Sequence, residues 1–268
     1  MADSFSGAGE SYEAERPQPR RGIKKGLYIL PSSFTAANIG MGFYAVMTAL
    51  RGFQLVGPGS TTEDIQHAAN FFNSAAIAIG VALLFDMLDG RIARMTKTTT
   101  EIGIQLDSLA DVVTFGIAPA VLAYAWGYGA AFEEGHPLYN LGLFVSFMFL
   151  ICGALRLARF NVQATRPRPL AEGTAKVDKK NFVGLPIPPA ACTVAALIHF
   201  SPTPLTPLVY GPERARLLSV LLMVMLAALG LLMVSTIRYT SFKTAGTGRR
   251  STRLVILLVA SVGMLVWL

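Results

Sequence analysis

The chain has 268 residues, of which 53% are hydrophobic and 15% are charged, and its mean hydropathy is +0.50. This hydrophobic share is far above that of ordinary globular domains, so the composition argues against a soluble protein. The formal net charge of +7 does not require nucleic acid, because a basic face is also attracted to a membrane surface that carries anionic lipids.

The first 26 residues are rich in Ser, Gly, Glu, Pro and Arg, which predicts a disordered, basic cytoplasmic arm. Apolar segments near the ~20 residues that cross a bilayer then recur along the chain, so we expect an all-α, polytopic bundle of transmembrane helices. A six-helix core is expected over residues 27–240, followed by a basic link and one extra helix over 241–268. The expected spans are 34–50, 70–88, 106–127, 138–158, 186–200, 216–237 and 253–268.

Positive charge alternates between the successive loops. Only Arg51, Arg214 and Arg216 fall on one side, and the other 20 of the 23 Lys and Arg residues fall on the opposite side. By the positive-inside rule, this asymmetry predicts a multi-pass protein of the cytoplasmic or inner membrane, with its N-terminus in the cytoplasm and its C-terminus outside. The basic cytoplasmic face would attract anionic lipids.

Four aspartates lie where the second expected span ends and the third begins. Asp86 and Asp89 are three residues apart and Asp107 and Asp111 are four apart, so each pair projects from one face of a helix. A tight cytoplasmic hairpin would then bring the two pairs together. Carboxylates are costly at membrane depth, and four of them balance the charge of two divalent cations, which predicts a two-metal site. Ligation by oxygen alone favours Mg²⁺, Mn²⁺ or Ca²⁺.

Small and basic residues accompany the aspartates. Gly90 and Gly103 would let a phosphate or a neighbouring helix approach the backbone closely, and Arg94 could bind phosphate. Two alternatives stay open at this point. The aspartates could form interfacial ion pairs with Arg91, Arg94 and Lys97, or they could relay protons. The last aspartate has no cation nearby in sequence and lies in an apolar run, which makes a purely structural role costly.

The pattern Asp-x2-Asp-Gly-x2-Ala-Arg-x8-Gly-x3-Asp-x3-Asp resembles the signature of the CDP-alcohol phosphatidyltransferase family. All eight fixed positions are present: Asp86, Asp89, Gly90, Ala93, Arg94, Gly103, Asp107 and Asp111. The resemblance implies a two-metal enzyme in which the four aspartates are metal ligands and Asp111 is also the catalytic base. It further implies that Thr35, in the first span, and the Gly, Ala and Arg positions of the motif contact the CDP or phosphate part of the substrate.

Three segments, 107–116, 156–161 and 182–188, resemble the members of this family that use L-serine as the acceptor. The implied substrates are therefore CDP-diacylglycerol and L-serine, and the implied products are phosphatidylserine and CMP. Arg156 and Arg159, beside Asn161, are candidates for binding the serine carboxylate. The resemblance also implies a homodimer, in which small residues such as Ala76 and Gly80 would allow close helix packing.

Other functions stay open from the sequence. A related synthase that uses glycerol phosphate, inositol phosphate or choline would share the metal site and differ in its acceptor pocket, although the arginines near the fourth span argue against the cationic choline. A carboxylate-bearing transporter would place charges near mid-bilayer on several helices, whereas here the charges cluster at one interface. A purely structural membrane protein would tolerate replacement of the aspartates.

Overall fold

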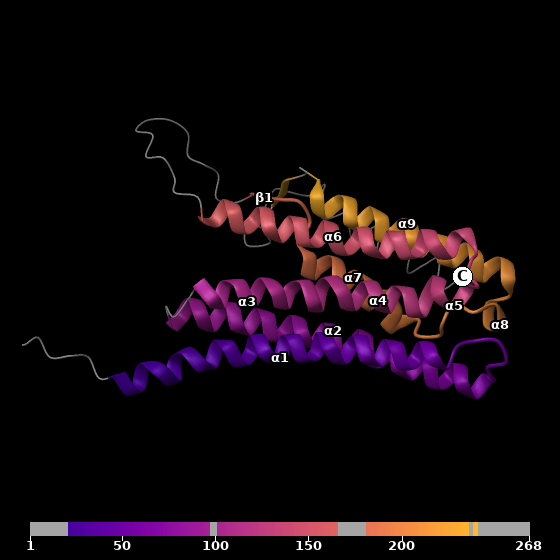
Figure 1. The fold of residues 1–268 in the computed structure, drawn as a ribbon, viewed down its shortest axis with the longest axis horizontal. Helices are drawn as coiled ribbons and strands as arrows, with labels where there is room; N and C mark the ends of the chain where they lie inside the picture. Colours follow the sequence, from indigo (N-terminus) through magenta and orange to yellow (C-terminus); the bar gives the residue numbers. More distant parts are fainter. Residues whose placement is uncertain (1–20, 97–100, 166–180, 236–237, 241–268) are drawn as a thin grey trace, which may run out of the picture.

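The computed structural model describes residues 21–96, 101–165, 181–235 and 238–240 of the chain. Long helices run side by side along one axis, with α1, α2 and α3 on one flank, α6 and α9 on the other, and α7 between them (Figure 1). This arrangement confirms the prediction of an all-α helical bundle. The described residues add only one short ribbon of two strands.

The first two helices, α1 (Arg21–Gln54) and α2 (Thr62–Thr96), are joined by a short turn and run antiparallel. Thr61 and Asp64 start α2 with reciprocal hydrogen bonds. The Asp64 N–H donates to Thr61 Oγ1 (3.2 Å), and the Thr61 N–H donates to Asp64 Oδ2 (2.8 Å). Since α1 begins at Arg21, the arm expected over residues 1–26 is helical from that residue onward, and residues 1–20 lie outside the described part.

The next membrane segment is not a uniform α-helix. It runs through α3 (Glu101–Asp111), the π-helix η1 (Val112–Ile117), α4 (Ala118–Ala123), a second π-helix η2 (Tyr124–Tyr128) and α5 (Gly129–Ala131). Short π-helical stretches are rare and occur frequently at functional sites. The first of them starts directly after the last aspartate of the motif.

The second half of the chain contains α6 (Pro137–Thr165), α7 (Ile187–Phe200), α8 (Pro207–Tyr210) and α9 (Pro212–Val234). Between α6 and α7, β1 (Asn181–Val183) pairs in antiparallel fashion with β2 (Arg238–Thr240), which follows α9. The Leu185 N–H also donates to the backbone oxygen of Leu232 (3.0 Å), so the entrance to α7 is fastened to the end of α9. In the sequence, β1 falls in the loop between the expected spans 138–158 and 186–200, because a strand of three residues carries no periodic signal.

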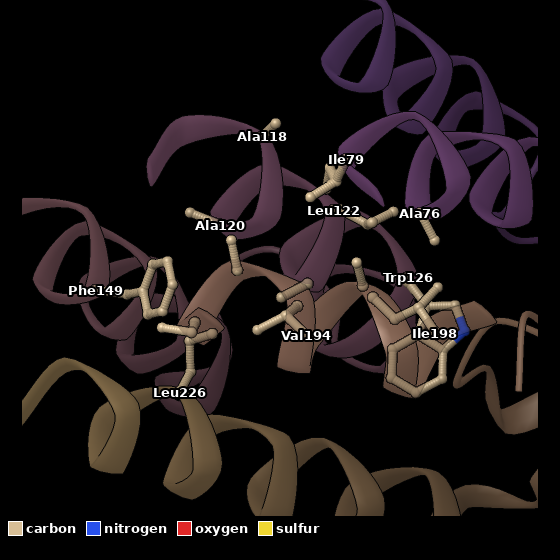
Figure 2. Packing of buried hydrophobic residues seen from close by; sticks show 14 of the residues in the cluster. Ala76, Ile79, Ala118, Ala120, Leu122, Trp126, Phe149, Val194, Ile198 and Leu226 are labelled. Atoms are coloured by element: carbon tan, nitrogen blue, oxygen red, sulfur yellow. The ribbon is translucent and has the colours of Figure 1, made fainter. Parts of the chain in front are cut away.

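The core lies along the centre of the bundle, where α7 meets the surrounding helices. Val194 and Ile198 of α7 lie among side chains of α4, η2 and α9, and each of these side chains is buried (Figure 2). Ala76 belongs to the same buried cluster, whereas Gly80 is exposed. Ala76 is therefore covered by other helices of the same chain and is not available for a contact with a second copy. The prediction that Ala76 and Gly80 together form a dimer contact is not supported by these positions.

Four described segments are long and apolar enough to cross a membrane: Thr62–Ile92, Ile102–Ala131, Pro137–Val162 and Pro212–Val234. Large apolar side chains also face outward, for example Phe43 (62% exposed) and Leu231 (68% exposed). Extensive apolar exterior surface fits an integral membrane protein. The first six expected spans fall on helices, and the expected span 253–268 lies outside the described residues.

Candidate active site

The four motif aspartates come from two helices that both pack against α1. Asp86 and Asp89 lie toward the end of α2, and Asp107 and Asp111 lie on α3. Asp107 interacts electrostatically with Asp86 and Asp89, and Asp111 interacts with Asp86 and Asp107. The two pairs therefore approach one another across the hairpin, while their role as metal ligands stays a prediction.

Burial differs among the four carboxylates. Asp89 is buried and accepts a hydrogen bond from the hydroxyl of Thr35, which lies on α1. Asp86, Asp107 and Asp111 are half-buried, and Asp111 Oδ1 is enclosed with no hydrogen-bond partner among the described residues. An enclosed carboxylate oxygen without a partner is costly, so a cation or a donor group would be favourable beside it.

The carboxylates do not form a closed metal cage as they stand. Within the described part of the chain, no three His, Cys, Asp or Glu side chains converge closely enough to hold a metal ion. The donor set nevertheless fits hard divalent cations, because all four groups are carboxylates and one of them has an orphaned oxygen.

Among the described residues, no ion pair involves the four aspartates. In the described ranges, the ion pairs join His67 to Glu63 and Arg216 to Glu213, and all of these side chains are exposed. Arg91 is also exposed. The side chains of Ala93, Arg94 and Lys97 lie outside the described part, so their predicted contacts stay predictions. Gly90 and Gly103 are partly buried, near the end of α2 and the start of α3.

The three residues predicted to bind serine all lie on α6, but in different surroundings. Arg156 is half-buried and interacts electrostatically with Asp111, and its Nε is enclosed without a partner among the described residues. Arg159 is exposed. Asn161 Nδ2 donates to the hydroxyl of Ser108 on α3 (2.8 Å), which ties the end of α6 to the aspartate helix. Their binding role stays a prediction.

Two polar residues near the aspartates were not among the predicted site residues. Thr114 Oγ1, in η1, donates to the backbone oxygen of Asn38 on α1 (3.1 Å), and both residues are buried. A side-chain carbon on Gly42 would lie 2.8 Å from Thr114 Cα, so glycine is what allows this close approach. A sequence signal was available, because polar residues inside membrane spans are costly and are commonly functional.

Helix α1 thus supports both halves of the motif. Thr35 bonds to Asp89 on α2, and one turn later Asn38 bonds to Thr114, three residues after Asp111. A single rigid helix therefore fixes the relative position of the two aspartate pairs.

Comparison with known proteins gives a match over most of the chain. The family model described as CDP-alcohol phosphatidyltransferase matches residues 28–234. A CDP-diacylglycerol–serine O-phosphatidyltransferase of Helicobacter pylori (strain ATCC 700392 / 26695) is 34% identical over 242 residues, which cover 88% of this chain and 82% of that protein. The protein of the same name from Saccharomyces cerevisiae is 36% identical over 159 residues, 59% of this chain and 49% of its own. An archaetidylserine synthase of Methanothermobacter thermautotrophicus is 40% identical over 126 residues, 46% of each chain.

Proposed function

The chain belongs to the CDP-alcohol phosphatidyltransferase family, and we propose that it transfers the phosphatidyl group of CDP-diacylglycerol to L-serine. The products are phosphatidylserine and CMP. The observation that carries this proposal is the approach of the four motif aspartates at one end of the bundle, beside Arg156. The choice of serine is supported by the similarity to enzymes that are named for this acceptor.

The reaction is a substitution at the phosphorus that carries the diacylglycerol. The serine hydroxyl oxygen attacks this phosphorus, and the bond from phosphorus to the bridging oxygen of the diphosphate breaks, so that CMP leaves with that oxygen. A hydroxyl is a weak nucleophile until a positioned base takes its proton, and Asp111 is the proposed base. The enclosed, unpartnered Oδ1 of Asp111 is an atom that could accept this proton.

Enzymes of this family generally depend on divalent metal ions. We place two ions of the Mg²⁺ or Mn²⁺ type, with Ca²⁺ as a further ion that such ligands bind, among Asp86, Asp89, Asp107 and Asp111. When bound, the ions would neutralise negative charge on the diphosphate and on the departing CMP.

The substrates are proposed to meet the carboxylates from different elements. We propose that Arg156 binds the serine carboxylate, and its electrostatic interaction with Asp111 supports this role. Arg159 and Asn161 are further candidates on the same helix. The residues proposed to contact the CDP and phosphate part of the donor are Thr35, Gly90, Ala93, Arg94 and Gly103.

The charge distribution supports an active site that faces the cytoplasm. Figure 1 shows the end of α1 and the start of α9 at the opposite end of the bundle from the end of α2 and the start of α3. Arg51, at the end of α1, and Arg214 and Arg216, at the start of α9, are exposed. Because the other 20 of the 23 Lys and Arg residues fall in the sequence on the expected cytoplasmic side, the positive-inside rule predicts that the aspartate end and the N-terminus face the cytoplasm. The diacyl tails can then stay in the bilayer while CMP departs into water.

Further parts of the proposal concern the whole assembly. The basic cytoplasmic face would attract anionic lipids, and we propose that the protein works as a homodimer and without nucleic acid. We also propose that residues 1–26 form a cytoplasmic arm that is disordered before α1, that residues 27–240 form the catalytic domain, and that residues 241–268 form a basic link and a last membrane helix.

The proposed function is tested by CMP release from the purified protein with CDP-diacylglycerol and Mg²⁺ or Mn²⁺. Parallel reactions contain L-serine, glycerol 3-phosphate, inositol phosphate, choline or no acceptor. We expect release that depends on serine and is abolished by a chelator. Release only with another acceptor would change the substrate within the family. If folded protein releases no CMP with any acceptor, the enzyme assignment is overturned in favour of transport or a structural role.

A further inference from the structure

The side-chain amide of Asn38 has no part in the chemistry described above. Asn38 is 1% exposed, and neither its Oδ1 nor its Nδ2 has a hydrogen-bond partner among the described residues. An amide that is removed from water and left unpaired destabilises a protein, and in a membrane helix there is little solvent to satisfy it. A buried group of this kind points to a ligand that supplies the missing partners.

Two contacts locate Asn38 relative to the aspartate helices. It lies three residues after Thr35, so the two side chains share one face of α1, and Thr35 is bonded to Asp89. The backbone oxygen of Asn38 is bonded to Thr114, one turn beyond Asp111. Side chains of a helix point toward its N-terminus. The amide of Asn38 is therefore directed toward the preceding turn of α1, which contains Thr35.

Two enclosed groups on other helices also lack hydrogen-bond partners in the described part of the chain. They are Asp111 Oδ1 on α3 and Arg156 Nε on α6, and the two side chains interact electrostatically with one another. Three different helices thus contribute an amide, a carboxylate and a guanidinium, each with unused hydrogen-bonding capacity. Of the residues proposed to contact the CDP-lipid, Gly90 and Gly103 lie near the hairpin end of α2 and α3, and Thr35 lies one turn before Asn38 on α1.

The three groups match the three polar parts of an amino acid that carries a hydroxyl. A guanidinium suits a carboxylate, and a carboxylate can take a hydroxyl proton. An α-ammonium then needs a hydrogen-bond acceptor. An amide oxygen can serve as that acceptor without adding a fifth negative charge beside the four aspartates.

We propose that Asn38 is a specificity residue that binds the α-ammonium group of the amino-acid acceptor through its Oδ1. This inference rests on the proposed function, because it requires an acceptor that carries an ammonium group. It adds to that function the residue by which the enzyme distinguishes an amino acid from other hydroxylated acids.

The test compares two acceptors with two forms of the full-length protein. L-Serine and 3-hydroxypropanoate share a hydroxyl and a carboxylate, and only serine has the amino group. The variant Asn38→Leu keeps nearly the same side-chain volume and removes both polar atoms. We expect the wild type to prefer serine in kcat/KM by at least about tenfold, and Asn38→Leu to lose most of this preference. The KM for CDP-diacylglycerol should change by less than about twofold.

A matched control replaces an asparagine far from the aspartates. Asn73 lies in the first half of α2, where its Oδ1 contacts His199 Nδ1 (2.7 Å), so Asn73→Leu should keep the preference for serine. An unchanged preference in folded Asn38→Leu would overturn the inference and leave the proposed function intact. If that variant does not fold, Asn38→Ala is measured in the same way and judged by the same criterion. A wild type that is inactive with serine would refute the proposed function, and the inference with it.

Discussion

At the scale of single residues, Asp111 is the group on which the proposed chemistry depends most. Asp111→Asn keeps the shape of the side chain but cannot take a proton from serine, so we expect CMP release to fall by at least about 100-fold. The melting temperature in detergent should stay near that of the wild type. The control Glu213→Gln changes an exposed carboxylate to an amide in the same way, and it should leave CMP release unchanged. A variant of Asp111 with more than about a tenth of normal activity would exclude its role as base.

Thr35 tests the support of the first aspartate pair. Thr35→Val removes the hydroxyl that donates to Asp89, and Thr35→Ser retains it. Since partners of metal ligands orient those ligands, we expect Thr35→Val to raise the Mg²⁺ concentration for half-maximal activity by about 10- to 100-fold, with Thr35→Ser close to the wild type. The measurement is a Mg²⁺ titration of CMP release. Equal behaviour of the two variants would show that the hydroxyl does not act through Asp89.

The spacing of residues in the sequence predicted the aspartate pairs, but not the hydrogen bonds that hold the neighbouring helices together. Asp86 and Asp89, like Asp107 and Asp111, were predictable because each pair is close in sequence and shares one helical face. The bond from Thr114 to Asn38 joins residues 76 positions apart, and the bond from Asn161 to Ser108 joins residues 53 apart. Such contacts depend on how the helices pack, which one hydropathy profile does not contain.

At the scale of elements, the membrane helices were predictable and their irregularities were not. Apolar runs predicted α2, α6, α7 and α9. A run of apolar residues in a membrane must form a helix, because only hydrogen bonds within the segment can satisfy its backbone there. The π-helices η1 and η2 have the composition of their α-helical surroundings, so the sequence offered no signal for them. The ribbon of β1 and β2 arises from strands of three residues each that are far apart in the chain.

The contact between α1 and η1 can be tested by two glycines of the same helix. A methyl group at Gly42 would collide with Thr114, whereas one at Gly40 would meet nothing within 4 Å. We therefore expect Gly42→Ala to lower the free energy of unfolding by about 1–3 kcal/mol and to reduce activity. Gly40→Ala should be neutral or stabilising, because alanine favours helices. Melting temperatures in detergent measure both changes, and similar values for the two variants would contradict the close approach.

At the scale of the whole molecule, exposed apolar side chains lie on the sides of the bundle, and charged residues lie toward its two ends. Exposed apolar side chains such as Phe43 and Leu231 cover the sides, where lipid tails would lie. The aspartates lie toward the end of α2 and on α3, whereas the exposed Arg51 and Arg214 lie at the end of α1 and the start of α9, which Figure 1 shows at the other end of the bundle. A membrane that encloses the middle of the bundle would therefore place the two ends in different compartments, and in the proposed orientation the aspartate end is the one that reaches the cytoplasmic pool of serine.

Single cysteines can establish which end faces the cytoplasm, once Cys152 and Cys192 have been replaced by alanine. Ile102→Cys lies at the aspartate end, where Ile102 is 82% exposed, and Gly57→Cys lies in the exposed turn between α1 and α2 at the other end. In intact spheroplasts, a membrane-impermeant maleimide should label position 57 alone, and position 102 should react only after lysis, because the positive-inside rule puts the aspartate end in the cytoplasm. The reverse pattern would place the active site outside, where serine and CDP-diacylglycerol would have to reach it from the opposite face.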